Sequence, residues 1–136
     1  MQFHAYLNFN GQCREAFTFY HQVLGGQIET MMTHGEMPTD EKVQPEWRDM
    51  ILHACLVVDG AMLMASDAPP QYFEKPQGFS VSIGLTDPDE AERIFHALAE
   101  GGQVRMAIGK TFWAERFGML VDRFGIPWMI NCAPAA

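Results

Sequence analysis

Two stretches of sequence decide the fold: EAFTFYHQVLGGQ at residues 15–27 and AERIFHALAEGGQ at residues 91–103. In each stretch the apolar residues recur at helical spacing, and both stretches end in the same Gly-Gly-Gln. Glycine ends helices because it adopts the left-handed backbone conformation that a helix C-terminus favours. An apolar run typical of a strand precedes each helix, and three more follow it. The sequence therefore predicts two similar halves, each in the order strand, helix, strand, strand, strand.

Apolar spacing and turn residues place the other elements. In the first half we expect a helix at residues 12–24 and strands at residues 3–9, 28–32, 51–58 and 61–66. In the second half we expect a helix after Asp87 and strands at residues 79–85, 104–108, 118–122 and 128–132. Asp59-Gly60 predicts a tight hairpin, because this pair suits a turn with positive φ. Asp87 is the expected N-cap, with Pro88 in the first turn and Glu90 completing a capping box.

Neither half is large enough to bury its own sheet face, and this sets the predicted domain organisation. The first half covers about residues 1–70 and the second about residues 78–136. Two such halves bury their apolar surfaces by packing together, so we expect one domain over residues 1–136. Residues 33–50 are polar and contain two prolines, which predicts a long excursion that is the most mobile part of the chain.

Composition and charge exclude several classes of protein. Of the 136 residues, 48% are hydrophobic and 19% are charged, which is typical of a globular protein. The net charge is -8 and the 9 Lys and Arg residues are scattered, so neither nucleic acid nor a membrane is an expected partner. The first residues, MQFHAYLNF, lack the basic and apolar regions of a signal peptide. Three widely separated cysteines are typical of reduced thiols, and we expect a cytoplasmic protein.

Several longer segments resemble one known family. These segments are YLNFNG (6–11), EAFTFY (15–20), HGEMP (34–38), LHACLVVDGAMLMASD (52–67) and FGMLVDRFGIPWMIN (117–131). They resemble the PhnB-like branch of the glyoxalase, bleomycin-resistance and extradiol-dioxygenase superfamily, also called the vicinal-oxygen-chelate superfamily. The D-R-F-G-x-P-W ending and T-F-W-A at residues 111–114 are the more specific pieces. The resemblance implies an α+β fold of two βαβββ modules that form an eight-stranded half-barrel cleft, a homodimer, and a small organic molecule as ligand.

The resemblance also implies metal ligands on the first and last strands of each half. The side chains that this sequence offers at those places are His4 or Tyr6, Met64 or Ser66, Ser80 or Ser82, and Met129. Thioethers and hydroxyl groups are poor ligands for a hard divalent ion, which prefers carboxylates and imidazoles. We therefore expect no cofactor and no tightly held metal, and at most a weakly bound divalent metal. The branch often carries a demethylubiquinone methyltransferase label, but the sequence has no glycine-rich loop between a strand and a helix for a nucleotide cofactor.

His53 is the candidate catalytic residue. Strand alternation places His53 and Cys55 on one face, and a neutral imidazole there can orient a ligand or act as a general base. A structural histidine held by a hydrogen bond is the alternative, and both interpretations stay open. His34 and Glu36 are interpreted either as groups at the cleft edge or as part of a solvated loop. The residues expected to line the cleft are His4, Tyr6, His53, Cys55, Met64, Ser66, Trp113 and Trp128.

Two of these cleft residues have alternative interpretations. Trp113 lies in a polar segment, which favours the rim of the cleft or a dimer contact. Trp128 fits the core and the cleft wall equally well. Two classes of function follow from the candidate site as a whole. One is a non-catalytic protein that binds a small molecule; the other is a glyoxalase-like lyase, isomerase or dioxygenase with His53 as acid or base. The incomplete set of metal ligands favours the first.

Overall fold

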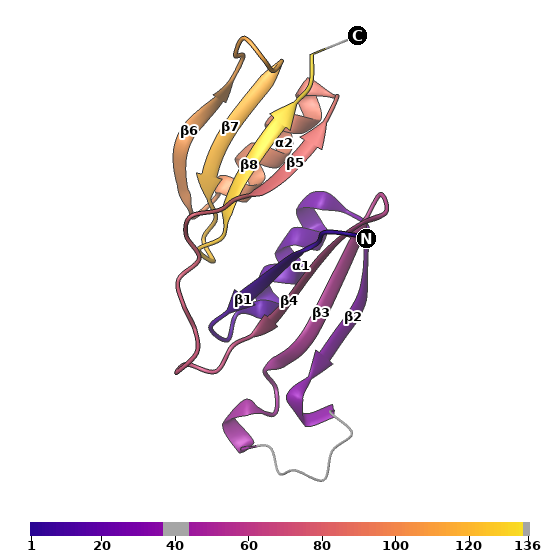
Figure 1. Cartoon of the computed structure of the whole chain (residues 1–136), viewed down its shortest axis with the longest axis vertical. Coiled ribbons are helices and arrows are strands. Elements are labelled where there is room, and N and C mark those ends of the chain that lie inside the picture. The colour runs from indigo at the N-terminus through magenta and orange to yellow at the C-terminus, as the bar shows by residue number, and fades with distance from the viewer. Residues whose placement is uncertain (37–43, 135–136) are drawn as a thin grey trace. The chain divides into compact units, whose positions relative to one another are not determined.

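The computed structural model describes residues 1–36 and 44–134 of the chain. The fold is α+β, and the chain divides into two compact units, Met1–Glu74 and Lys75–Ala136. Within these residues, each unit contains one four-stranded mixed sheet and one α-helix, and neither sheet closes into a barrel (Figure 1). Among the described residues, no helix is both long and apolar enough to cross a membrane.

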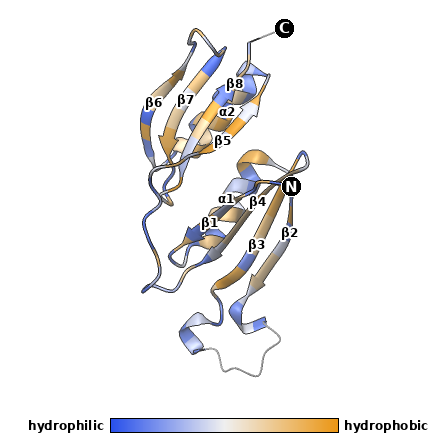
Figure 2. Cartoon of the chain, in the orientation of Figure 1, coloured by the Kyte–Doolittle hydropathy of each residue, from blue (hydrophilic) through white to orange (hydrophobic). Residues whose placement is uncertain are grey.

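Unit 1 has the predicted order of elements. They are β1 (Ala5–Phe9), α1 (Cys13–Leu24), β2 (Gln27–Thr33), β3 (Ile51–Val58) and β4 (Ala61–Asp67). Two short 3-10 helices, η1 (His34–Glu36) and η2 (Pro45–Trp47), lie between β2 and β3. The strand order is β1-β4-β3-β2, with β1 parallel to β4 and the other pairs antiparallel. Figure 2 shows that β3, near the middle of this sheet, is mainly hydrophobic.

Unit 2 repeats this arrangement. Its elements are β5 (Val81–Leu85), α2 (Pro88–Ala99), β6 (Gln103–Gly109), β7 (Arg116–Val121) and β8 (Pro127–Cys132). The strand order is β5-β8-β7-β6, again with only the first strand parallel to its neighbour. The prediction of two βαβββ modules is therefore confirmed. The predicted half-barrel concerns both sheets together and stays a prediction.

Each helix buries the apolar stripe that its sequence predicts. In α1, Ala16, Phe17 and Tyr20 are fully buried, and the helix packs mainly on β3. Burying a large aromatic side chain contributes about 2 kcal/mol, so this face holds the helix on the sheet. In α2 the buried residues are Ala91, Ile94, Phe95 and Leu98, and the helix packs mainly on β7.

The repeated Gly-Gly pair has the same steric cause in both units. A Cβ atom on Gly26 would lie 2.1 Å from the carbonyl oxygen of Val57 in β3. A Cβ atom on Gly102 would lie 2.2 Å from the carbonyl oxygen of Val121 in β7. Real Cβ atoms do not approach an oxygen so closely, so only glycine fits where the chain leaves the helix and meets the sheet.

Most turn and cap predictions are confirmed. The hairpin between β3 and β4 has Asp59 at φ 50° and Gly60 at φ 81°, as a tight turn requires. The Asp87 carboxylate accepts a hydrogen bond from the backbone N–H of Asp89 at 3.0 Å, which caps α2. The predicted capping box is wrong for Glu90. Its carboxylate binds the side chain of Arg93, one turn along the helix.

The structure corrects several strand boundaries, including the start of β7 at Arg116 instead of residue 118, and adds detail to the excursion. The first strand begins at Ala5 instead of residue 3, and β5 begins at Val81 instead of residue 79. The segment predicted at residues 33–50 contains η1 and η2, and the backbone N–H of His34 bonds back to the carbonyl of Met50. The prediction of mobility falls partly on residues 37–43, which lie outside the described residues.

Unit 1 is fastened by a buried carboxylate that the sequence analysis missed. Asp67, at the end of β4, accepts hydrogen bonds through Oδ1 from the backbone N–H groups of Gly11 and Cys13, both at 3.0 Å. Its Oδ2 accepts from the backbone N–H of Ile51 at 2.8 Å. The Gln12 side chain does not cap α1, so Asp67 supplies an acceptor at the start of this helix from across the sheet.

Asp122 fastens the β7–β8 turn of unit 2 in a similar way. Its Oδ1 accepts from the backbone N–H groups of Phe124 and Ile126, at 2.9 and 3.0 Å. Its Oδ2 accepts from the indole N–H of Trp128 at 2.8 Å. The D-R-F-G-x-P-W segment is therefore a structural turn that anchors a buried tryptophan.

Candidate functional site

The candidate site lies on the face of the unit 1 sheet that α1 does not cover. Strand alternation puts the buried Leu7, Ala54 and Leu56 on the helix side, so their neighbours point to the other side. Register aligns these neighbours in rows across the sheet: Tyr6 pairs with Met64, and Met64 with Cys55. We call this surface the helix-free face of unit 1, and its residues are Tyr6, Asn8, Met32, His53, Cys55, Met64 and Ser66.

Tyr6 and His53 form the polar centre of this face. The Tyr6 hydroxyl oxygen lies 3.2 Å from Nδ1 of His53, within hydrogen-bond distance. The two rings also stack, with centroids 5.8 Å apart and planes inclined by 20°. Tyr6 is 45% exposed, so the pair is open to solvent and to a ligand. These two residues are separated by most of unit 1 in the sequence, and the order β1-β4-β3 brings them together.

The remaining nitrogen of His53 is free for a ligand. Among the described residues, Nε2 of His53 has no hydrogen-bond partner, whereas Nδ1 is held by Tyr6. Met32 pairs with His53 in the register of β2 and β3, and it is an exposed apolar side chain. A polar ring nitrogen beside a flexible thioether suits a ligand with one polar group on an apolar body.

Cys55 is a packing residue on this face and not a nucleophile. It is buried, and burial raises the pKa of its thiol, with the Glu29 carboxylate raising it further. The protonated thiol is the less reactive form, which favours a packing role for Cys55 beneath this face. Met64 and Ser66, which are partly exposed on β4, continue the same face.

The structure does not bring every predicted site residue to this face. His4 lies before β1, is exposed, and has its ring Nε2 at 3.0 Å from Oε1 of Gln2. Trp113 belongs to unit 2, where it is 46% exposed and packs edge-on against Phe117 at 5.2 Å. His34 packs edge-on against Trp47, at 5.8 Å between ring centroids.

Trp128 is corrected from a cleft residue to a core residue. It is only 1% exposed, and its indole N–H is hydrogen bonded to the Asp122 carboxylate. Alternation along β8 places Trp128 with the buried Ile130 and Cys132, whereas Met129 and Asn131 point to the other side. Its only polar group is thus engaged inside unit 2, and Trp128 is left out of the candidate site.

The residues at the positions implied for metal ligands do not fit a divalent metal. β1 offers Tyr6, β4 offers Met64 and Ser66, and β5 and β8 offer Ser82 and Met129. In the part of the chain that the structure describes, no three His, Cys, Asp or Glu side chains converge on one point. Phenol, thioether and hydroxyl groups do not replace the imidazoles and carboxylates of a catalytic site.

Unit 2 has a corresponding helix-free face, which the sequence analysis did not define. The register of its strands gives two rows on this face. One row is Ser82, Met129, Met119 and Met106; the other is Gly84, Asn131, Phe117 and Gly109. In the sequence, Met129 and Asn131 alternate with Trp128 and Ile130, which indicates that the two pairs lie on opposite faces of β8. Which of these faces is the helix-free one could not be decided from the sequence.

Two units of βαβββ order, each with one helix on its sheet, define the glyoxalase-like fold class, and solved structures confirm it. The PhnB protein from Bacillus cereus matches with a TM-score of 0.79 at 22% identity, covering 98% of this chain and 100% of that chain. The fosfomycin resistance protein FosX from Listeria monocytogenes matches with a TM-score of 0.68 at 7% identity, covering 98% and 93%. The chain therefore has a glyoxalase-like fold.

The sequence comparisons identify the branch of this superfamily. A family model described as 3-demethylubiquinone-9 3-methyltransferase matches residues 1–131. Protein YjdN from Escherichia coli is 36% identical over 134 residues, which is 93% of this chain and 91% of that protein. Protein PA1353 from Pseudomonas aeruginosa has a solved structure with a TM-score of 0.91 at 51% identity, covering 99% of both chains. The chain belongs to this family, the PhnB-like branch of the vicinal-oxygen-chelate superfamily.

Proposed function

We propose that this protein binds a small organic molecule on the helix-free face of unit 1, with the Tyr6–His53 pair as the polar anchor. The observation that carries the proposal is the 3.2 Å contact between the Tyr6 hydroxyl and Nδ1 of His53, which leaves Nε2 without a partner among the described residues. A half-open face with one oriented polar group and apolar neighbours is typical of a ligand site. The superfamily membership is consistent with such a role but does not define it.

In this proposal, the hydrogen bond from Tyr6 determines which ring nitrogen of His53 carries the proton. A neutral imidazole carries one proton, on either Nδ1 or Nε2. We propose that the Tyr6 hydroxyl donates to Nδ1, so that Nε2 carries the proton and donates to an acceptor on the ligand. The ligand would then present a carbonyl or another oxygen acceptor to His53 and place its apolar part against Met32 and Met64.

Two variants, studied by native mass spectrometry and calorimetry, test this proposal. Native mass spectrometry of the purified protein identifies co-purified small molecules, whose affinity is then measured by calorimetry. We expect His53→Ala to weaken binding by about 1–3 kcal/mol, since it removes a buried hydrogen bond to the ligand. Tyr6→Phe keeps the ring stacking and loses only the hydroxyl, so we expect a smaller loss of about 1 kcal/mol. Equal affinities in the wild type and both variants would refute the site.

The same contact favours one alternative function, a glyoxalase-like enzyme with His53 as acid or base. If Nδ1 instead donates to the Tyr6 oxygen, Nε2 is unprotonated and can accept a proton from a substrate. Nitrogen-15 NMR of the histidine rings distinguishes the two tautomers directly. A protonated Nε2 supports the binding function, and an unprotonated Nε2 supports the enzyme.

We also propose that the protein is a homodimer in the cytoplasm and acts without a tightly held cofactor. Support for the dimer comes from β6, an edge strand on which Val104 and Met106 are exposed. Support for the compartment comes from three unpaired, buried cysteines. Light scattering at micromolar concentration should give about twice the 15.3 kDa mass of one chain. A monomer over a wide dilution range would contradict the dimer.

A further inference from the structure

The helix-free face of unit 2 differs in chemistry from that of unit 1. Its two rows, Ser82, Met129, Met119, Met106 and Gly84, Asn131, Phe117, Gly109, contain no charged side chain. The whole chain has a net charge of -8, so an uncharged area of this extent is a local feature. A charged ligand would lose hydration on these two rows without gaining an oppositely charged partner within them. The face therefore suits an uncharged ligand.

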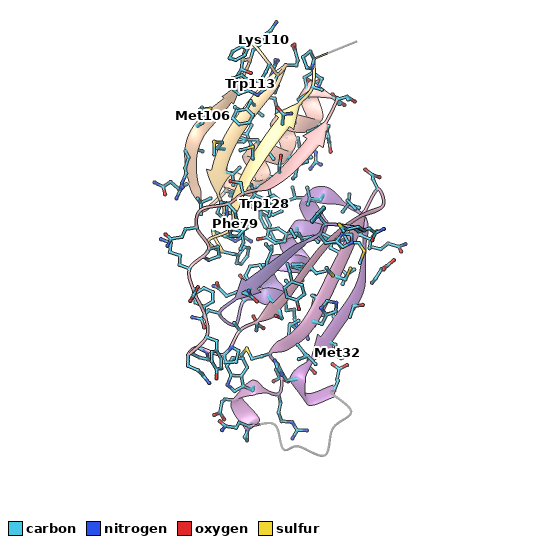
Figure 3. All side chains as sticks on the ribbon, in the orientation of Figure 1. Met32, Phe79, Met106, Lys110, Trp113 and Trp128 are labelled. Carbon is cyan, nitrogen blue, oxygen red and sulfur yellow. The ribbon has the colours of Figure 1, made fainter. Side chains whose placement is uncertain are left out.

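An aromatic wall stands at one side of this face. Phe117 is buried beneath Trp113, with ring centroids 5.2 Å apart and an edge-on arrangement. Phe112 packs on Trp113 in turn, at 4.8 Å. Figure 3 shows Trp113 and Met106 in unit 2, over the strands β7 and β6. Such edge-on aromatic pairs present a rigid ring face on which another flat ring can stack.

Methionines and a glycine make room beside this wall. Met106, Met119 and Met129 lie side by side on three neighbouring strands. Thioethers adapt their rotamers and make favourable contacts with aromatic rings. At Gly84, on β5, an added Cβ atom would meet nothing within 4 Å, so space is open above the backbone. The face is therefore adaptable at the methionines and open at the glycine.

Within the described part of the chain, Asn131 provides an unpaired hydrogen-bond acceptor on this face. It lies between Gly84 and Phe117 in the register, and its Oδ1 is buried with no hydrogen-bond partner among the described residues. An unpaired buried acceptor is unfavourable, and a ligand N–H or O–H that reaches it removes the penalty. Met129, two residues earlier in β8, lies on the same face, and its flexible side chain can change rotamer.

From these four observations we infer that the helix-free face of unit 2 binds an uncharged, planar aromatic ring that donates one hydrogen bond to Asn131. The ring stacks against Trp113, rests on Met119 and Met129, and occupies the space above Gly84. This goes beyond the function proposed for the Tyr6–His53 pair, because it concerns the other unit and names a ligand class.

Indole is a suitable probe, and 1-methylindole is its matched control without the N–H group. With methionine methyl groups labelled with carbon-13, NMR titration reports each thioether separately. We expect saturable ring-current shifts at Met119 and Met129, and none at Met50, which belongs to unit 1. Indole should bind about fivefold more tightly than 1-methylindole, and Asn131→Leu should abolish this preference.

Gly84→Leu fills the open space above Gly84 without straining the backbone, because Gly84 has no positive φ and an added Cβ atom meets none of the described residues beyond its chain neighbours within 4 Å. We expect at least about tenfold weaker indole binding, while the urea midpoint stays unchanged. Gly84→Ala should give an intermediate loss. The inference is overturned if Met119 and Met129 show no saturable shift, if Gly84→Leu binds indole normally, or if 1-methylindole binds as tightly as indole. His53→Ala with the co-purified ligand reports on the unit 1 site separately.

Discussion

The two units share a backbone plan but differ in the chemistry of their helix-free faces. In unit 1 the rows contain Tyr6 and His53, which contact each other and offer a ring nitrogen. In unit 2 the equivalent register positions contain Ser82 and Phe117. The buried positions, in contrast, correspond closely, as the glycines at the helix ends show. The comparison teaches that packing constrains one side of each sheet and leaves the other side free to acquire different ligand chemistry.

The largest effects should come from the glycines that both units need. Gly26→Ala and Gly102→Ala each force a Cβ atom into a carbonyl oxygen of the sheet, at 2.1 and 2.2 Å. We expect each change to lower the free energy of unfolding by about 3 kcal/mol or more, measured by urea denaturation. Gly84→Ala, with open space at its Cβ position, is the control, and its free energy of unfolding should stay close to that of the wild type. A tolerated alanine at either position would show that the two units do not share this constraint.

A second comparison concerns the two buried carboxylates. Asp67→Asn and Asp122→Asn each turn one acceptor oxygen into a donor that faces other donors. We expect losses of about 2–3 kcal/mol in the free energy of unfolding for each variant. Asp59→Asn is the matched control, because Asp59 lies in an exposed hairpin turn that asparagine suits equally well. If only one of the two variants is destabilised, the carboxylates do not play equivalent roles.

The two helices differ at their first residue, which is Cys13 in α1 and Pro88 in α2. Burial raises the pKa of the Cys13 thiol, and the Asp67 carboxylate raises it further, against the opposing effect of Arg14. A group whose pKa is raised by folding stabilises the fold below its unfolded pKa of about 8.5, and this contribution is lost as the pH rises.

Cys13 alone should therefore lower the free energy of unfolding by about 2 kcal/mol between pH 8.5 and pH 10. Denaturation curves at several pH values measure this slope. Cys13→Ala should have a shallower slope than the wild type, although its stability at neutral pH is lower. Thr18→Ala, at an exposed position of α1, should keep the wild-type slope. Equal slopes for all three proteins would rule out Cys13 as the source.

The smallest expected effect is that of adding a divalent metal. In both units the side chains at the implied ligand positions are poor ligands for such an ion. We expect elemental analysis of protein purified without chelator or affinity tag to find well under one metal per chain. Added zinc should leave the thermal midpoint unchanged, since a ligand that does not bind the native state cannot stabilise it. Stoichiometric metal that is lost in both His4→Ala and His53→Ala would instead favour metal-dependent catalysis.

Local patterns predicted the elements well, and contacts between distant residues were the part that sequence could not supply. The buried stripe of α2 and the Asp59-Gly60 hairpin follow from spacing and turn chemistry, which depend only on neighbours. The Asp67 anchor joins residues far apart in the chain, so no local pattern indicates it. Trp128 was ambiguous because an indole fits a core or a cleft, and only its bond to Asp122 decides.

The candidate site shows the same limit. His53 was identified from alternation within one strand, and that placement agrees with the structure. Its partner, Tyr6, was named as a cleft residue and at an implied metal position, but not as a contact of His53. That contact depends on the order in which β1, β4 and β3 pair. The face of unit 2 was missed because Gly84 carries no side chain and Asn131 lies in a strand in which most residues are buried.

In both units the first strand pairs with the last strand, which is synthesised much later. β1 pairs with β4, and the backbone N–H of Gly11 bonds to Asp67, 56 residues further along the chain. A ribosome adds about 5–20 residues per second, so β1 emerges seconds before its partner has been made. During that interval its hydrogen-bonding edge is unpaired and can join strands of other nascent chains. Slow translation between β1 and β4 therefore lengthens the period in which a new chain of this protein is prone to aggregate.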